Sequence, residues 1–166
     1  MERVKTEITY LKGDATRPTG TGQKIIVHIC NNIGAWGAGF VLALSKRWKQ
    51  PEAAYRMLTR YNLGEYHLVQ VEDDIHVCNL IGQEGTISRK NPHHLLPPVR
   101  YVAIEKGLKG LTEYIGNYSH FRKEPITVHM PKIGSGLAGG NWKIIERIIE
   151  VTLCEAGIPV TVYEFN

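Results

Sequence analysis

Two stretches of the chain each combine a short apolar run, a glycine-rich loop and an amphipathic run, in that order. The clearer stretch is residues 131–142 (PKIGSGLAGGNW), which follows the apolar run 126–129 and precedes the amphipathic run 142–153. This order predicts a strand that leads through a glycine loop into a helix. Glycines let the main-chain N–H groups approach an anion closely, and a helix N-terminus attracts negative charge. The loop therefore predicts a phosphate-binding site.

The second stretch, residues 31–40 (NNIGAWGAGF), repeats this arrangement after the apolar run 25–29. Two such loops favour a ligand with two phosphates, or with a phosphate and a sugar. A continuous apolar run is typical of a strand that is buried on both faces of a parallel sheet. Ligands of these sheets bind beyond the carboxyl ends of the strands, and both loops are expected there.

The remaining periodicity alternates between strand and helix patterns, which predicts an α/β fold with a mainly parallel sheet and a few antiparallel edges. Asn141 is the expected N-cap of the last helix. The irregular, proline-containing segment 85–98 suggests a flap. The expected strands are 8–11, 24–29, 66–71, 75–81, 126–130 and 160–163, and the expected helices are 40–48, 52–61, 99–115 and 142–153.

The composition is that of an ordinary globular chain of 166 residues, with 43% hydrophobic and 22% charged residues, and it fits a single domain. Nothing approaches the ~20 apolar residues of a membrane span, and residues 1–5 lack the apolar core of a signal peptide. Cys30, Cys78 and Cys154 are odd in number and far apart, as is typical of reduced thiols. We therefore expect a cytoplasmic monomer without a membrane partner.

Five short motifs follow one another along the chain: KGDAT at 12–16, HICN at 28–31, GAWGAG at 34–39, PKIGSGL at 131–137 and TVY at 161–163. Their order resembles a macrodomain, above all the branch of the terminal ADP-ribose protein glycohydrolase and the yeast-type ADP-ribose-1″-phosphate phosphatase. The resemblance covers nearly the whole chain. It implies a three-layer α/β/α fold with a mixed, mainly parallel central sheet, and a cleft for ADP-ribose or ADP-ribose 1″-phosphate.

At one end of the implied cleft, Asp14 corresponds to the acidic residue that accepts a hydrogen bond from the adenine amino group. A carboxylate suits this role because it only accepts. Ala15 would contact the base through its main chain, and Phe165 would pack on the adenine. The residues alone also allow a second interpretation, in which Asp14 is a turn or capping residue and Phe165 is part of the core.

The resemblance assigns the rest of the ligand to the two glycine loops. Asn31 corresponds to a polar residue that faces the distal ribose, although an asparagine here could also satisfy main-chain groups of its loop. Gly37, Ala38 and Gly39 would wrap the distal ribose and its phosphate. The diphosphate would be cradled by Lys132, Ile133, Gly134, Ser135, Gly136, Leu137 and Ala138.

The chain departs from the glycohydrolase pattern, because Gln83 and Ala138 stand where that branch has a nucleophilic lysine and an aspartate. No lysine occurs between residues 50 and 89, so a covalent route through an amine lacks its nucleophile. The phosphatase branch agrees better, because His28 precedes the Cys-Asn step and imidazole titrates near neutral pH. We predict an ADP-ribose-binding enzyme that hydrolyses the terminal phosphate of ADP-ribose 1″-phosphate, with His28 and Asn31 as catalytic candidates. The residues alone favour the alternative in which His28 is a strand histidine that is hydrogen-bonded in the core.

Two other functions stay open at this point. The chain could remove ADP-ribose from protein or nucleic acid by water attack, or it could bind ADP-ribose without turnover. The net charge of +4 and the basic residues Arg89, Lys90 and Arg100 favour a polyanionic partner only weakly. No Cys or acidic residue completes a zinc pattern around His93 and His94, so no metal or cofactor is expected.

Overall fold

A computed structural model describes residues 4–86, 97–117, 124–136 and 138–165. Six strands form one sheet in the order β1-β6-β5-β2-β4-β3. Neighbouring strands are parallel throughout, except that β3 pairs antiparallel with β4. The strands are β1 (Ile8–Lys12), β2 (Gln23–Asn31), β3 (Tyr66–Glu72), β4 (Ile75–Gln83), β5 (Ile126–Pro131) and β6 (Val160–Glu164). The expected mixed, mainly parallel sheet is confirmed, with a single antiparallel edge among the described strands.

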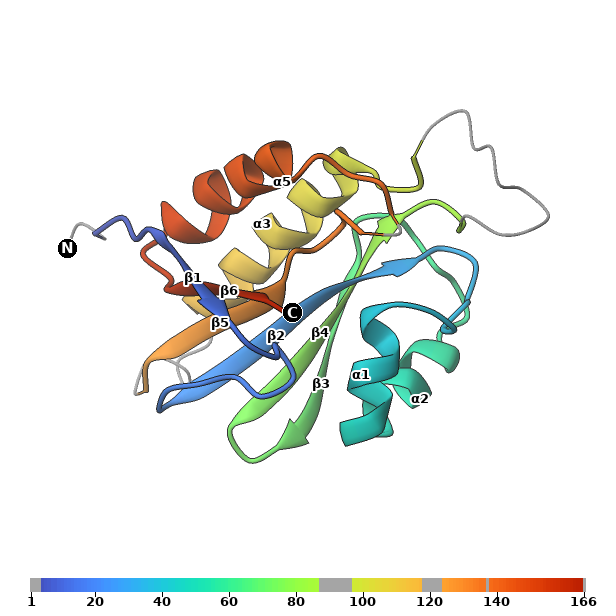
Figure 1. Cartoon of the computed structure of the whole chain (residues 1–166), viewed down its shortest axis with the longest axis horizontal. Helices are drawn as coiled ribbons and strands as arrows, with labels where there is room; N and C mark the ends of the chain where they lie inside the picture. The colour runs from blue at the N-terminus through green and yellow to red at the C-terminus, as the bar shows by residue number, and fades with distance from the viewer. Residues whose placement is uncertain (1–3, 87–96, 118–123, 137, 166) are drawn as a thin grey trace.

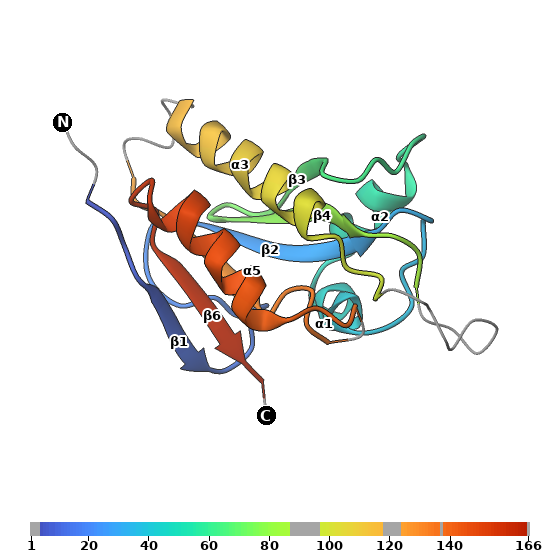
Figure 2. The same cartoon turned by 90° about the horizontal axis from the view of Figure 1, so that it is seen from above.

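Helices cover both faces of the sheet and make three layers (Figure 1). On one face lie α1 (Phe40–Arg47) and α2 (Gln50–Arg56), and on the other α3 (Tyr101–Asn117) and α5 (Trp142–Ile149). Figure 2 shows α3 and α5 running side by side across the sheet. The three-layer α/β/α architecture is therefore confirmed. None of the helices in the described ranges has the length and apolarity that crossing a bilayer requires.

The apolar run in β2 is explained by two cores. Ile25 and Val27 are buried against the α3 and α5 side, whereas Ile26 and Cys30 are buried in a second cluster on the α1 and α2 side. Because successive side chains of a strand point to opposite faces, a strand between two cores must be apolar at nearly every position. His28 shares its face with Ile26 and Cys30, and it lies among the side chains of the second cluster.

Helix boundaries differ most from the sequence prediction at two places. The helix expected at 52–61 ends at Arg56, and Leu58 and Tyr61 pack on the second cluster from irregular chain, so their three-residue spacing only imitates a helix. The helix expected at 142–153 changes to a π-helical segment, η1 (Glu150–Cys154). The predicted cap is confirmed, because the Asn141 side chain accepts a hydrogen bond from the Lys143 main-chain N–H at 2.9 Å.

Candidate functional site

The glycine loops follow β2 and β5, which are adjacent parallel strands, so both loops lie at the same edge of the sheet. They border a groove with three adjoining parts: a wide compartment of about 540 Å³, a central compartment of about 290 Å³ and a narrow compartment of about 210 Å³. Gly39, Phe40 and Pro131 line both the wide and the central compartments. Ile29, Ala38, Val41 and Gln83 line both the central and the narrow ones.

Asp14 and Ala15 lie in the wall of the wide compartment, in the connection between β1 and β2. One carboxylate oxygen of Asp14 accepts hydrogen bonds from the main-chain N–H and the hydroxyl of Thr16, both at 2.8 Å. The other oxygen has no hydrogen-bond partner among the described residues. The carboxylate therefore both stabilises its turn and keeps an acceptor for a ligand.

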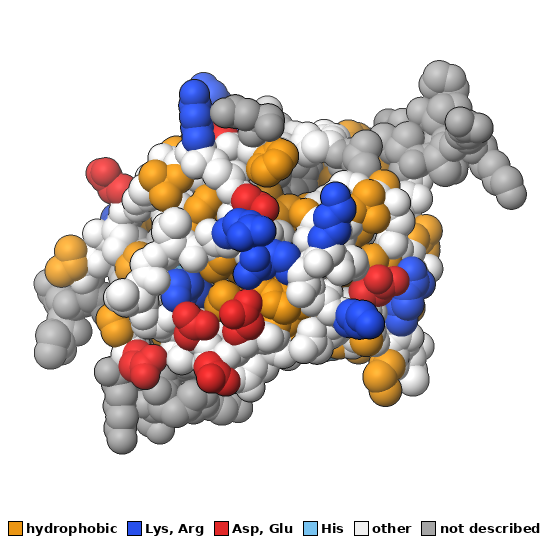
Figure 3. Space-filling model, turned by 60° about the horizontal axis from the view of Figure 1, so that its bottom comes forward, with side chains coloured by type: hydrophobic (Ala, Val, Ile, Leu, Met, Phe, Trp, Pro, Cys, Tyr) orange, Lys and Arg blue, Asp and Glu red, His pale blue; other side chains and the backbone are white. Residues whose placement is uncertain are grey.

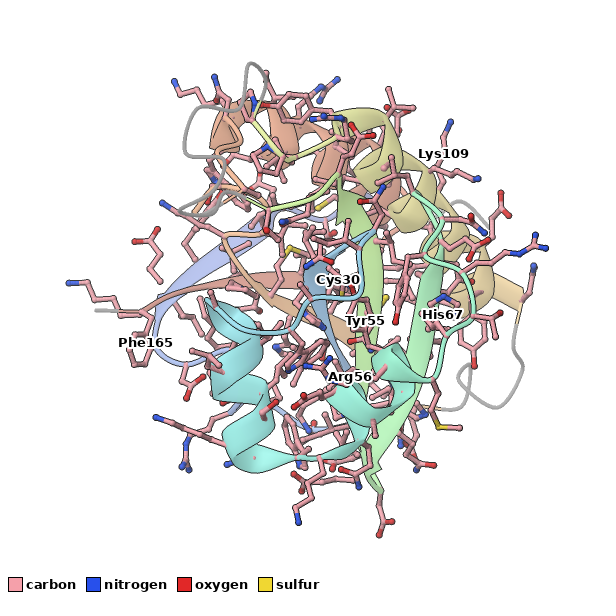
Figure 4. All side chains as sticks on the ribbon, turned by 90° about the vertical axis from the view of Figure 1, so that its right-hand side faces the viewer. Cys30, Tyr55, Arg56, His67, Lys109 and Phe165 are labelled. Atoms are coloured by element: carbon pink, nitrogen blue, oxygen red, sulfur yellow. The ribbon has the colours of Figure 1, made fainter. Side chains whose placement is uncertain are left out.

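Two phenylalanines border the wide compartment from different elements. Phe165 follows β6, and 78% of its surface is exposed, so it is not a core residue. Figure 4 shows it at the outer edge of the molecule, whereas Cys30 and Tyr55 lie in the interior. Phe40 is the first residue of α1 and lines the same compartment. Exposed aromatic faces around one compartment suit a flat, partly apolar ligand group.

The central compartment lies at the N-terminus of α1. Gly39 caps this helix at φ 80°, a conformation that favours glycine. The main-chain N–H groups of Gly37, Ala38 and Gly39 have no hydrogen-bond partner within the described part of the chain. Unpaired N–H groups at the start of a helix form an anion-binding surface.

The β5–α5 loop forms the other side of the central compartment. Its chain is held by main-chain hydrogen bonds from Gly139 N–H to the Gly136 carbonyl (3.0 Å) and from Gly140 N–H to the Gly134 carbonyl (2.7 Å). Four of its predicted ligand residues border this compartment, namely Lys132, Gly134, Gly136 and Ala138.

The other three predicted residues of that loop are placed differently. Ile133 is 2% exposed and belongs to the core on the α3 and α5 side. The Ser135 hydroxyl donates a hydrogen bond to the Lys132 carbonyl at 2.8 Å, and Ser135 borders none of the three compartments. Leu137 lies outside the described residues. Ile133 and Ser135 thus shape the loop from within.

Asn31 borders the narrow compartment, but most of its hydrogen-bonding capacity is used inside its own loop. Its side-chain oxygen accepts from the main-chain N–H groups of Ile33 and Ala35, both at 3.0 Å, and lies 2.8 Å from the Tyr55 hydroxyl. Its amide nitrogen donates to the Ala35 carbonyl at 2.7 Å. One amide hydrogen remains for a ligand. The arrangement favours the alternative in which Asn31 organises the loop.

His28 borders the central compartment but exposes only 1% of its surface. Its Nε2 lies 2.5 Å from the side-chain oxygen of Asn79, whose amide nitrogen donates to the Pro51 carbonyl at 3.0 Å. This network assigns the proton to Nε2 and leaves Nδ1 as an acceptor without a partner among the described residues. Burial lowers the pKa of His28 to about 4. The imidazole is therefore neutral at pH 7, unlike the near-neutral titration expected from the sequence.

The wide compartment contains residues that the sequence did not suggest. Arg17, Lys46 and Arg47 line it together with Phe40 and Ala43. Positions 40, 43 and 47 have the spacing of residues that share one face of a helix. This spacing could have identified them in the sequence as residues that line one side of a site. In the narrow compartment Trp36 and Thr86 are lining residues, whereas Trp142 borders none of the three.

The segment 85–98 is described only at its two ends, so His93, His94, Arg89 and Lys90 lie outside the described residues. Among the described residues no three His, Cys, Asp or Glu side chains are grouped so that they could hold a metal ion.

An open groove at the carboxyl ends of parallel strands, built from two glycine loops, defines an α/β ligand-binding domain. A macrodomain protein from Streptomyces coelicolor is 43% identical, covers 96% of this chain with all of its own, and superposes with a TM-score of 0.78. The chain belongs to the macrodomain family. A protein of unknown function from Bacteroides thetaiotaomicron is 48% identical over 95% of this chain and 97% of its own, with a TM-score of 0.84. No family model matches.

Two kinds of protein are among the curated relatives that also match. The ADP-ribose 1″-phosphate phosphatase of Saccharomyces cerevisiae is 29% identical, over 87% of this chain and 92% of its own length. The chromodomain-helicase-DNA-binding protein 1-like of Mus musculus is 30% identical over 96% of this chain. This chain spans only 18% of the mouse protein and 16% of its Danio rerio counterpart.

Proposed function

We propose that this macrodomain binds ADP-ribose and hydrolyses the terminal phosphate of ADP-ribose 1″-phosphate. The main observation behind this proposal is the order of the three compartments along one groove. This order matches the order of adenosine, diphosphate and distal ribose in ADP-ribose. The wide compartment has aromatic faces and a carboxylate acceptor, the central one has unpaired main-chain N–H groups, and the narrow one has the amides of Asn31 and Gln83. The phosphatase named among the relatives supports the same ligand class.

In this arrangement the free oxygen of Asp14 accepts a hydrogen bond from the adenine amino group, while Phe165 and Phe40 pack against the base. The N–H groups of Ala38 and Gly39 face the diphosphate from one side, and the β5–α5 loop faces it from the other. Gly37 faces the distal ribose in the narrow compartment. Oriented N–H groups in a partly dehydrated groove stabilise phosphate charge without reorganising. Asn31 acts as a positioning residue, because its side chain holds the β2–α1 loop in shape.

The hydrolysis needs a water molecule, a proton acceptor and a departing sugar oxygen. Water attacks the phosphorus atom, the bond from phosphorus to the oxygen on C1″ breaks, and that oxygen gains a proton, giving ADP-ribose and inorganic phosphate. The unpaired, buried Nδ1 of His28 is the proposed acceptor of the water proton, because the imidazole is neutral across the physiological pH range. Its pKa of about 4 makes it a weak base, since general bases work best with a pKa near the operating pH. The terminal phosphate would then lie where the central and narrow compartments meet, beside Gln83.

The second candidate is a reader, that is, a protein that binds ADP-ribose without hydrolysing it, and one observation favours this function. Cys30 is the only titratable side chain among the described residues that line the narrow compartment. Burial raises its pKa well above the usual range, so it stays a thiol. A terminal phosphate deep in that compartment would meet only neutral groups, and binding without chemistry would result.

The deciding experiment measures phosphate release from ADP-ribose 1″-phosphate by the whole chain, alongside calorimetric titration with ADP-ribose. We expect both binding and turnover, and His28→Gln should lower kcat by about 100-fold or more, the usual contribution of a general base. Gln can still donate a hydrogen bond to Asn79. His67→Gln on β3 is the matched control, because His67 lies on the opposite side of the molecule from Phe165 (Figure 4).

The outcomes separate the candidates. Binding without phosphate release would establish the reader, and full activity of His28→Gln would remove His28 from the mechanism. The pH dependence gives a second readout. Because the phosphate monoester itself titrates near pH 6, the informative quantity is the ratio of wild-type to His28→Gln kcat/KM. This ratio should stay constant above about pH 5 and fall as His28 becomes protonated near its pKa of about 4. A fall centred near pH 6.5 would contradict the buried, neutral base.

A further inference from the structure

Trp36 forms part of the wall of the narrow compartment, and only 6% of its surface is exposed. Its ring packs against the imidazole of His28 on β2 and against the ring of Tyr55 on α2, with centroids 5.4 Å apart in both pairs. The His28 contact is edge-to-face, at an interplanar angle of 83°. The orientation of this one indole therefore affects both the shape of the narrow compartment and the packing around His28.

The polar edge of the indole is held by a chain of hydrogen bonds that reaches the surface. The Trp36 Nε1–H donates to the Ser45 hydroxyl oxygen in α1 at 2.9 Å. The Ser45 hydroxyl donates to one carboxylate oxygen of Glu52, in the first turn of α2, at 3.2 Å. The other oxygen of Glu52 accepts from Arg56 Nε at 2.8 Å. The hydrogen bonds from Arg56 and, to a smaller extent, from Ser45 lower the pKa of the Glu52 carboxyl, so it stays an ionised acceptor.

The direction of each hydrogen bond in this chain is fixed by chemistry. An indole N–H can only donate and a carboxylate can only accept, so the Ser45 oxygen accepts from Trp36 and its single hydrogen points to Glu52. A buried tryptophan N–H needs such a partner. Glu52 thus orients the Ser45 hydroxyl, and Ser45 in turn orients the indole.

We propose that Ser45 and Glu52 are positioning residues, which hold Trp36 in the orientation that fits the distal ribose of ADP-ribose. The inference rests on the proposed function, which places that ribose in the narrow compartment. Ser45 and Glu52 line none of the three compartments, so both act on the ligand through Trp36. Trp36 itself lines the narrow compartment but neither of the other two, so the effect should be confined to the ribose.

The outer end of the hydrogen-bond chain is an exposed ion pair, in which the side chains of Glu52 and Arg56 are 34% and 51% exposed. Acidic side chains lie beside basic ones at several other places on the face of the molecule shown in Figure 3. Exposed ion pairs contribute little to stability. Glu52→Ala should therefore leave the fold intact while it removes the acceptor of the Ser45 hydroxyl.

The experiment measures the affinity of the whole chain for ADP-ribose and for ADP by calorimetry. ADP contains the adenosine and the diphosphate but lacks the distal ribose. In Ser45→Ala the indole N–H loses its acceptor, so the affinity for ADP-ribose should fall about five-fold, the usual net effect of one hydrogen bond, with the affinity for ADP unchanged. Glu52→Ala should act in the same direction with a smaller effect. Ser45→Thr keeps the hydroxyl and should retain the affinity of the wild type.

The indole N–H signals in a proton–nitrogen NMR spectrum give a second readout. Ser45→Ala should shift the signal of Trp36, which is assigned by its loss in Trp36→Phe. The signals of Trp48 and Trp142 are internal references, because their N–H groups donate to side chains other than Ser45. A shift confined to Trp36 would show that the substitution acts on this indole and not on the whole fold.

Thr112→Ala is the matched control, because the Thr112 hydroxyl donates to the Leu108 carbonyl within α3, on the other face of the sheet. It should change neither affinity. A loss of affinity for ADP-ribose alone in Ser45→Ala supports the proposal. Equal losses for both ligands, or an unchanged affinity for ADP-ribose, overturn it, and Glu52→Ala decides in the same way if Ser45→Ala does not fold. A wild-type chain that binds neither ADP nor ADP-ribose would instead overturn the proposed function.

Discussion

The two glycine loops look alike in sequence but are held in shape by different interactions. The β5–α5 loop is held by its own main chain, through the hydrogen bonds from Gly139 and Gly140 to earlier carbonyls. The β2–α1 loop is held by side chains: Asn31 accepts from two main-chain N–H groups, and the Tyr55 hydroxyl accepts from the Gly34 N–H at 3.1 Å. A glycine-rich loop can therefore be rigid for two separate reasons.

This difference indicates which substitutions should disrupt each loop. In the β5–α5 loop a glycine is needed where the main chain packs against itself. A single added methyl group can therefore disrupt the conformation of this loop. In the β2–α1 loop the essential groups are an amide and a hydroxyl that comes from α2, 24 residues away in the chain. Substitutions in the two loops should accordingly separate the effects of close packing from those of hydrogen bonding.

The largest effect is expected for Gly140→Ala. The added Cβ would lie 2.4 Å from the Gly134 carbonyl oxygen, the same oxygen that accepts the Gly140 N–H. Neither atom can move without opening the turn, so the free energy of unfolding should fall by about 2–3 kcal/mol, as for overpacked sites. Urea unfolding monitored by tryptophan fluorescence measures it.

Gly136→Ala in the same loop is the matched control, because a Cβ there meets nothing within 4 Å and its φ is not positive. Equal losses for Gly136→Ala and Gly140→Ala would show that the loop tolerates no side chain anywhere, and would contradict close packing at Gly140 as the cause.

A smaller effect is expected for Tyr55→Phe, which keeps the shape of a fully buried ring and removes only its hydroxyl. The Gly34 N–H and the Asn31 main-chain carbonyl would lose a partner, and unfolding should become easier by about 1 kcal/mol, the usual net value of a hydrogen bond. Affinity for ADP-ribose should fall as well, because Asn31 and its loop lose a support. Denaturation and calorimetry on the same sample give both numbers.

Tyr61→Phe is the control for that variant. Its ring packs against Tyr55 with centroids 4.8 Å apart, and no described residue forms a hydrogen bond with its hydroxyl. If Tyr61→Phe weakened ADP-ribose binding as much as Tyr55→Phe, aromatic packing and not the hydroxyl would hold the loop.

The same contrast explains what the sequence could predict. Local patterns identified both strand–loop–helix units, the Asn141 cap and the parallel sheet. Each of these features depends on neighbouring residues and on the spacing of apolar residues along the chain. The role of Asn31 depends on Tyr55. The protonation of His28 depends on Asn79 and on burial of the imidazole between the sheet and the helices packed on it. These partners lie far away in sequence, and no local pattern reports them. The cations of the wide compartment were missed because Arg17 and Lys46 line one compartment only when β1, β6 and α1 are assembled.

The smallest effect on stability is expected for Gly37→Ala, and it is the most informative for function. A Cβ on Gly37 meets nothing within 4 Å and the main chain there has no positive φ, so the fold has no need of glycine at this position. Alanine should leave the free energy of unfolding unchanged or raise it by about 0.5 kcal/mol, because it restricts the unfolded chain. The methyl group would, however, occupy part of the narrow compartment. ADP-ribose should therefore bind more weakly to a protein of undiminished stability. If Gly37→Ala bound ADP-ribose as well as the wild type, the ligand would not approach this part of the β2–α1 loop, and the distal ribose would have to lie elsewhere in the groove.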